Sequence, residues 1–176
     1  MKNLLVALTF ATTIAGNTAV AQVQTVAAVD LESYMGTWYE QARLPMYFQR
    51  KCDRNTTANY SLRPDGHVDV LNSCEADDGR KIVAQGVARK VGNSTSRLEV
   101  RFAPAFLSFL PFVWGDYWII GLDEGYRWSV VGSPDRKYLW ILSREKQLPD
   151  ETYRQLVDLA KAQGFDTSRL VRTRQL

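Results

Sequence analysis

The sequence predicts an all-β domain: an eight-stranded, up-and-down antiparallel β-barrel with one α-helix packed against its outside. Three observations support this prediction. Short β-rich segments are separated by turn signals along most of the chain, several segments alternate between apolar and polar residues, and helical spacing occurs only near the C-terminal end. Eight strands in simple succession can close on themselves, which removes exposed sheet edges and leaves an interior wide enough for one small molecule.

Eight segments have the composition of short strands. They are predicted at residues 37–43, 56–62, 68–71, 82–91, 97–102, 117–122, 126–131 and 138–143. Short runs that favour turns lie between them. Arg63-Pro64-Asp65-Gly66 is the clearest, because Pro and Gly stand where a tight turn prefers them. We therefore expect most neighbouring strands to pair as antiparallel hairpins.

The segment 97–102 shows the alternation most clearly. Its apolar residues are Leu98, Val100 and Phe102, and the charged residues between them are Glu99 and Arg101. One face of this strand is therefore expected to point into the barrel and the other into water. The charged outer face also argues against a barrel that spans a membrane, which needs a continuous apolar band outside.

The last part of the chain changes to helical spacing. The apolar residues that recur at this spacing are Tyr153, Leu156, Val157 and Ala160. Pro149-Asp150-Glu151 suits a first helical turn, and Gly164 suits a stop. We expect one amphipathic helix that serves as a packing element.

Residues 1–21 are predicted to be a signal peptide. Lys2 supplies a positive charge, residues 4–15 form a short apolar run, and Ala19-Val20-Ala21 fits a cleavage site. The expected domain is then residues 22–176, exported to the periplasm or secreted. No cysteine lies near the cleavage site, so no lipid anchor is expected; an uncleaved membrane anchor is the alternative.

The chain has two cysteines, Cys52 and Cys74, whose spacing is not that of a metal site. In an exported protein a disulfide between them can persist, and it would contribute roughly 3 kcal/mol to stability. The alternative is a free, reactive thiol.

Charge and composition exclude several classes of function. The formal net charge is +3 and the basic residues do not gather in one run, so no nucleic-acid partner is expected. His67 is the sole histidine and follows the turn at 63–66. No catalytic constellation, metal cluster or cofactor motif surrounds it, and neither metal nor cofactor is expected.

Two motifs carry a family resemblance. Gly36-Thr37-Trp38-Tyr39-Glu40 resembles the G-x-W signature on the first strand of the lipocalin family, and the segment 138–144 resembles its last-strand motif, which ends in Arg144. The resemblance implies that Trp38 plugs the closed end of the barrel, with Arg144 across its indole as a cation–π partner. Of the family's middle motif only Asp123 is kept. The chain most resembles the bacterial outer-membrane lipocalins and apolipoprotein D.

The resemblance implies a carrier and not an enzyme. Lipocalins bind, store or transport small hydrophobic ligands, and fatty acids or lysophospholipids of the cell envelope are the bacterial candidates. The alternative is a lipocalin-fold enzyme acting on a lipid-like substrate. Such an enzyme would need Cys52 or Cys74 as a free nucleophile.

The resemblance also implies which residues form the ligand-binding wall, carried over where the strand patterns align with those of the family. The inward residues expected to contact ligand are Ala58, Tyr60, Val70, Asn72, Ala84, Ala88, Val100, Phe102, Tyr117, Tyr138 and Trp140. Each apolar one could instead simply fill a closed barrel. A buried Asn72 needs a hydrogen-bond partner, which ligand or structure could supply. On the seventh strand the pattern leaves open whether Trp128 or Ser129 points inward.

The loop 103–114 is unusually apolar for a connection between strands. Phe106, Phe109 and Phe112 lie close together in it, at the expected open end of the barrel. We expect an entrance loop that gates the ligand or contacts a membrane surface or a partner. The alternative is a loop that folds over the mouth and packs internally. Whether it also forms a homodimer is left open.

Overall fold

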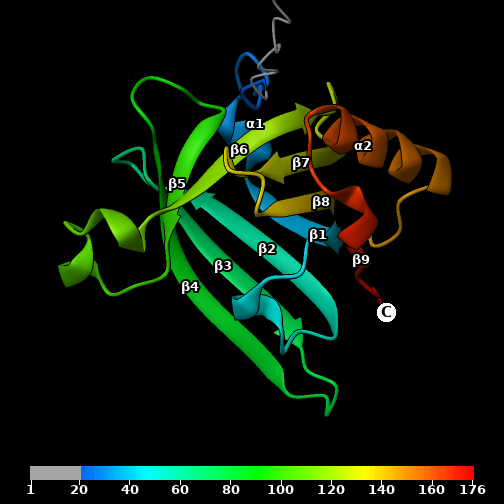
Figure 1. The fold of residues 1–176 in the computed structure, drawn as a ribbon. Coiled ribbons are helices and arrows are strands. Elements are labelled where there is room, and N and C mark those ends of the chain that lie inside the picture. Colours follow the sequence, from blue (N-terminus) through cyan, green and yellow to red (C-terminus); the bar gives the residue numbers. More distant parts are fainter. Residues whose placement is uncertain (1–20) are drawn as a thin grey trace, which may run out of the picture.

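The computed structural model describes residues 21–176 and shows a closed antiparallel β-barrel (Figure 1). Neighbouring strands pair in the order β2-β3-β4-β5-β6-β7-β8-β1, and a further pairing of β1 with β2 closes the ring. The strands are β1 Gly36–Arg43, β2 Arg54–Leu62, β3 Val68–Glu75, β4 Lys81–Lys90, β5 Arg97–Arg101, β6 Gly115–Leu122, β7 Trp128–Gly132 and β8 Leu139–Ser143. The predicted eight-stranded barrel is confirmed.

Several boundaries differ from the predicted ones. Strand β3 continues to Glu75 instead of ending at residue 71, because it pairs over that length with both β2 and β4. Strand β7 starts at Trp128, because Tyr126 has a φ of 58° and still belongs to the turn. Phe102 and Tyr138 lie just outside the ends of β5 and β8.

Two short elements were not predicted. Helix α1, Leu31–Tyr34, precedes β1, and strand β9, Val171–Arg172, pairs with the end of β1 near the C-terminus. Both are too short to produce a periodic pattern, so they could not be predicted from hydrophobic periodicity.

The C-terminal helix lies outside the barrel, as predicted. Helix α2, Asp150–Ala162, buries Leu156 and Ala160 against the outer faces of the last strands (Figure 1). Phe165, just after the helix, packs so closely on Gly132 of β7 that a Cβ there would lie 2.5 Å from the ring. A second apolar layer therefore covers one side of the barrel.

Strand β7 turns Ser129 inward and Trp128 toward the helix. Ser129 is fully buried and hydrogen-bonds the hydroxyl of Tyr34 at 2.9 Å, whereas Trp128 packs with the residues under α2. The open question of the seventh strand is thereby decided by contacts that are distant in sequence.

One end of the barrel is plugged by Trp38. Its side chain is fully buried, and its Nε1 donates to the carbonyl oxygen of Tyr34 at 2.9 Å. The guanidinium carbon of Arg144 lies 3.9 Å from the centre of the Trp38 ring. Arg144 also donates to the carbonyl oxygens of Ser33 and Thr37, each at 2.9 Å. Strand β1, helix α1 and the residue after β8 are thus fastened together at the closed end.

The turn between β6 and β7, which contains Asp123, is held by a salt bridge. Asp123 accepts two hydrogen bonds of 2.8 Å from Arg127. This guanidinium lowers the pKa of Asp123 to about 2, so the carboxylate stays charged and holds the β6–β7 turn.

The other end of the barrel is open and has longer loops. The β1–β2 loop carries the 3₁₀ helix Tyr47–Gln49, and the β5–β6 loop carries two more, Ala105–Leu107 and Pro111–Val113. A disulfide joins Cys52 in the first loop to Cys74 on β3. Both cysteines of the chain are used, which rules out the free-thiol alternative.

Within residues 21–176 no helix has the length and apolar character needed to cross a bilayer. The predicted signal peptide spans residues 1–21, and all of it except Ala21 lies outside the described residues.

Replacing Cys52 and Cys74 together by Ala is expected to lower the free energy of unfolding by about 3 kcal/mol. The bridge spans a sequence separation of 22 residues, and its loss frees that loop in the unfolded chain. Urea unfolding followed by tryptophan fluorescence measures the change, and reduced wild-type protein serves as the control. Equal midpoints for the oxidised wild type and the variant would show that the bridge adds no stability.

Candidate functional site

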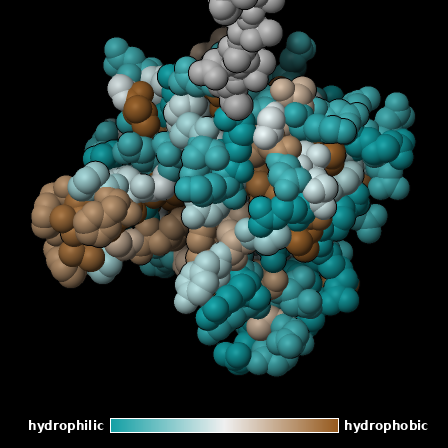
Figure 2. All heavy atoms as spheres, viewed as in Figure 1, coloured by the Kyte–Doolittle hydropathy of each residue, from teal (hydrophilic) through white to brown (hydrophobic). Residues whose placement is uncertain are grey.

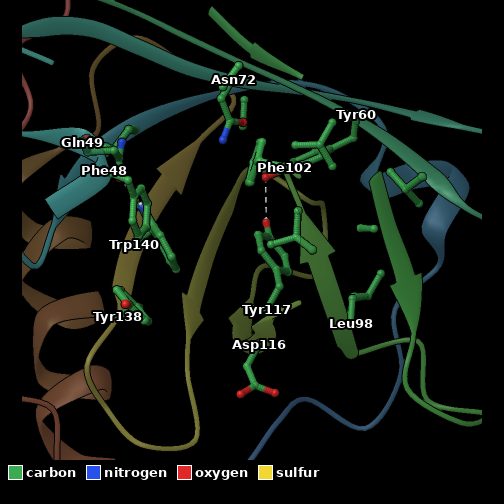
Figure 3. A pocket seen from close by; sticks show the side chains of 18 of the residues that line it. Phe48, Gln49, Tyr60, Asn72, Leu98, Phe102, Asp116, Tyr117, Tyr138 and Trp140 are labelled. Atoms are coloured by element: carbon green, nitrogen blue, oxygen red, sulfur yellow. Dashed lines mark hydrogen bonds between the residues drawn. The ribbon is translucent and has the colours of Figure 1, made fainter. Parts of the chain in front are cut away.

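The interior of the barrel holds a cavity of about 750 Å³ that reaches the open end (Figure 3). All the inward residues assigned from the sequence line it: Ala58, Tyr60, Val70, Asn72, Ala84, Ala88, Val100, Phe102, Tyr117, Tyr138 and Trp140. They line it because alternate residues of a strand share one face, and one face of every strand points inward. Whether each contacts a ligand is a separate question, taken up below.

The floor of the cavity carries three tyrosine hydroxyls. The Tyr117 hydroxyl lies 2.9 Å from that of Tyr60 (Figure 3). It also lies 3.0 Å from the hydroxyl of Tyr34, which in turn bonds to Ser129. Tyr34 comes from α1, so the helix that closes the barrel also builds its floor. Sequence alternation found Tyr60 and Tyr117 but missed Tyr34, because α1 was not predicted.

Burial keeps these tyrosines uncharged. Loss of hydration raises the pKa of Tyr34 to about 12, and it raises the pKa values of Tyr60 and Tyr117 as well. The floor therefore offers neutral hydrogen-bonding groups over the whole physiological pH range.

Halfway up the wall, Asn72 stands between two small residues. In the ladder it lies directly opposite Ala58 on β2 and Ala84 on β4. The side-chain oxygen of Asn72 is buried and has no hydrogen-bond partner within the described chain. The alanines leave room beside this amide, so a polar atom in the cavity can reach it.

The mouth is lined by stacked aromatic side chains. The ring centres of Phe48 and Tyr138 are 5.6 Å apart, and those of Tyr138 and Trp140 are 6.1 Å apart (Figure 3). Trp140 donates from Nε1 to Gln49 Oε1 at 2.9 Å. This contact holds the 3₁₀ helix of the β1–β2 loop against the barrel wall.

A buried polar network behind the mouth was missed by the sequence analysis. Glu40 is only 2% exposed; one carboxylate oxygen accepts from Arg43 at 2.7 Å and the other from Gln49 at 2.8 Å. Thr173, near the C-terminus, also donates to Glu40. Alternation from Trp38 places Glu40 inward, which is a usable signal. Nothing local indicates its partners, Gln49 in a loop and the distant Thr173.

The loop 103–114 projects from the rim and exposes its aromatic side chains. Phe106, Phe109 and Phe112 are 74%, 77% and 79% exposed, and Figure 2 shows the apolar projection that they form. Phe112 also borders the cavity, whereas Phe106 and Phe109 are not among its lining residues. The alternative in which the loop packs internally is therefore wrong for these side chains.

Trp114 anchors the base of this loop. Two cations contact its ring, with the guanidinium carbons of Arg89 and Arg101 at 3.9 and 5.3 Å from its centre. Arg101 is only 8% exposed, so it is not the solvated exterior residue that strand alternation suggests.

The chemistry of the cavity is that of binding. Its wall is mostly apolar, with a few separated polar groups, as in sites that hold small hydrophobic molecules. His67, in the β2–β3 turn, is not among the lining residues, and both cysteines are bridged. Across residues 21–176 no group of three or more His, Cys, Asp or Glu side chains is placed to hold a metal ion. Fold and site together define a β-barrel that binds small hydrophobic molecules in its interior.

Comparison with known proteins agrees with this class. A family model described as a lipocalin-like domain matches residues 29–175, and the chain belongs to the lipocalin family. Temperature-induced lipocalin-1 of Arabidopsis thaliana is 41% identical over 157 residues, covering 88% of this chain and 83% of the plant protein. Outer membrane lipoprotein Blc of Escherichia coli is 40% identical over 148 residues, covering 83% and 79%. Apolipoprotein D of Mus musculus is 32% identical over 156 residues, covering 83% and 77%.

The fold is shared with more distant lipocalins of known structure. Insecticyanin from the tobacco hornworm Manduca sexta superposes with a TM-score of 0.67 at 20% identity, covering 88% of this chain and 85% of the insect protein. The expected likeness to outer-membrane lipocalins and apolipoprotein D is confirmed, and with it the family's role in small hydrophobic ligand binding.

The raised pKa of Tyr34 predicts a loss of stability in alkali. The unfolded side chain loses its proton near pH 10, whereas the folded one keeps it to about pH 12. Each pH unit between these values should therefore cost about 1.4 kcal/mol of unfolding free energy, and none is lost below pH 10. Urea unfolding at pH 9, 10 and 11 measures the slope in the wild type and in Tyr34→Phe. The unfolding free energy of the variant should fall less steeply with pH than that of the wild type. Equal slopes would contradict a raised pKa of Tyr34.

Proposed function

We propose that this lipocalin binds and carries an acyl lipid, a fatty acid or a lysophospholipid, as part of lipid handling in the cell envelope. The observation that supports the proposal is the cavity itself: about 750 Å³, open at one end and lined mostly by apolar side chains. An acyl chain fits the apolar wall, and a headgroup at the open end stays in contact with water. The proposed role is that of a carrier and not of an enzyme.

The expected affinity is that of a reversible carrier. Burying about ten methylene groups gains roughly 8 kcal/mol before the costs of association and ordering are subtracted. Contacts of the headgroup or chain with polar wall groups such as Asn72 recover part of this cost. A dissociation constant in the micromolar range is therefore expected.

Residues 103–114, which we call the entrance loop, are proposed to contact a membrane surface. The segment contains no charged residue, and its three phenylalanines are almost fully exposed (Figure 2). Across the mouth, Tyr47 and Phe48 are 76% and 61% exposed. Isolated apolar residues on a surface are common, but a projecting group of them at the mouth of a lipid cavity suits loading from a bilayer.

The proposed location is outside the cytoplasm, in the periplasm or secreted, without a lipid anchor. The disulfide between Cys52 and Cys74 supports a location outside the cytoplasm, because disulfides persist in oxidising compartments. The proposed export signal and its cleavage after residue 21 can be checked by sequencing the N-terminus of the protein recovered from the periplasm or medium.

Binding of palmitate and of palmitoyl-lysophosphatidylcholine by the purified protein tests the proposed function. Ala84→Phe places a ring beside Asn72 inside the cavity, in space that the bound acyl chain would occupy. Fitting both the ring and the lipid should cost about 1–3 kcal/mol and weaken binding by about tenfold. Val83→Phe is the matched control, because Val83 precedes Ala84 on β4 and its side chain points outward and is 50% exposed. Tryptophan fluorescence titration and native mass spectrometry give affinity and stoichiometry. Failure of both lipids to bind the wild type would refute the proposal.

Replacing Phe109 and Phe112 by Ser should weaken association with phospholipid vesicles by at least about tenfold. The change removes two aromatic side chains whose burial is worth about 1.5–3 kcal/mol each. Cosedimentation with the vesicles measures it, and the double variant Leu71→Ser/Val83→Ser, with 41% and 50% exposed side chains, is the control. Unchanged vesicle binding contradicts the proposal. If the variant instead abolishes a dimer seen by analytical ultracentrifugation, the entrance loop is a homodimer interface.

A further inference from the structure

The floor of the cavity is polar at one point only, where the three tyrosine hydroxyls meet. The side chains around them are apolar and include Val68, Ala88, Leu98 and Leu142. An unmodified acyl chain ends in a methyl group, which can use apolar surface but no hydrogen-bonding group. The hydroxyl cluster is therefore more than an unmodified acyl chain requires.

The hydrogen bonds of this cluster form a chain with two ends. Tyr60 bonds to Tyr117, Tyr117 to Tyr34, and Tyr34 to Ser129. Ser129 Oγ donates to the carbonyl oxygen of Gly121, at a long 3.5 Å. Each hydroxyl has one proton to donate. If Ser129 donates to Gly121, every other proton must point the same way along the chain, and Tyr60 donates to Tyr117.

Tyr60 is the end of the chain that borders the cavity. In this arrangement its oxygen keeps free lone pairs, so it can accept a hydrogen bond from a group in the cavity. Reversing the chain loses only the long bond to Gly121, and the Tyr60 proton then points into the cavity. The Tyr60 hydroxyl can thus accept from or donate to a partner at little cost. Its side chain is 7% exposed and lines the cavity wall (Figure 3).

The partner that suits this position is uncharged. Arg144, the cation that packs against the Trp38 ring, is engaged elsewhere. Its three nitrogens donate to the carbonyl oxygens of Tyr126, Thr37 and Ser33. A carboxylate on the floor would have only neutral hydroxyls beside it in an apolar environment, which is unfavourable. A hydroxyl can both donate and accept, as the Tyr60 end of the chain can.

We propose that Tyr60 forms a polar subsite on the cavity floor that takes a hydroxyl group at or near the far end of the ligand's acyl chain. The natural ligands would then include hydroxylated acyl lipids, bound with the headgroup at the mouth and the hydroxyl against Tyr60. This inference rests on the proposed function, since it assumes an acyl chain in the cavity.

Two probes that differ only at the chain end test the subsite: palmitate and ω-hydroxypalmitate. The wild type should bind the hydroxylated probe at least as tightly as palmitate, because the hydroxyl finds a partner on the floor. In Tyr60→Phe the ratio of the affinity for ω-hydroxypalmitate to that for palmitate should fall by about five- to tenfold, as expected for loss of one buried hydrogen bond. Tyr153→Phe, which alters a tyrosine of the outer helix α2 that does not line the cavity, is the control and should leave the ratio of the two affinities as in the wild type.

The outcomes separate this proposal from the function on which it rests. An equal ratio of affinities in the wild type and Tyr60→Phe overturns the subsite while palmitate binding still supports the carrier. A wild type that binds ω-hydroxypalmitate more than tenfold weaker than palmitate also overturns it, and needs no variant to fold. If the wild type binds neither probe, the proposed function and the subsite both fail.

Discussion

Pairing of β1 on both sides is the interaction on which the rest of this structure depends. Strand β1 bonds to β2 along one edge and to β8 along the other, so the first and last strands of the barrel meet and no open edge is left between them. Without this closure the inward faces of the strands would enclose nothing. The same strand carries Trp38, and its last residues pair with β9, the short strand near the C-terminus. Closure, plug and attachment of the chain terminus all depend on eight residues.

The interior of the barrel is filled by side chains near the closed end and left empty toward the open end. Near the closed end large side chains fill it, with Trp38, Ile119 and Val131 fully buried. Toward the open end β2 and β4 present small residues to the interior, so the space between the walls is left free. A well-packed core would gain dispersion energy in that space. The protein forgoes this gain in the half of the barrel that faces the mouth, and its stability therefore has to come from the closed end, the disulfide and the apolar layer beneath α2.

The parts of this architecture that depend on residues close together in the sequence could be predicted from it. Alternation within strands, together with the family resemblance, placed the lining residues, and the resemblance of the segments around Trp38 and Arg144 to family motifs implied the plug at the closed end. What the sequence did not predict depends on residues far apart. Tyr34 reaches the cavity floor through α1, a single turn without periodicity. Glu40 meets Gln49 and Thr173 only because the loop and the C-terminal end come together at β1. The extent of β3 was underestimated because its last residues are poor strand formers that are held by neighbours on both sides.

The rim of the barrel is constrained unequally around its circumference. On the side of the β1–β2 loop, a covalent bond at Cys52 and the hydrogen bonds of Gln49 with Glu40 and Trp140 tie the loop to three different strands, β3, β1 and β8. On the side of the entrance loop the described contacts concentrate at its base, where Trp114 stacks on Arg89 and bonds back to Ser108. Widening the mouth toward the second side breaks fewer interactions than widening it toward the first. The mouth is therefore held asymmetrically: the side of the β1–β2 loop is fixed in place, and the side of the entrance loop is the one that can move outward with fewer bonds broken.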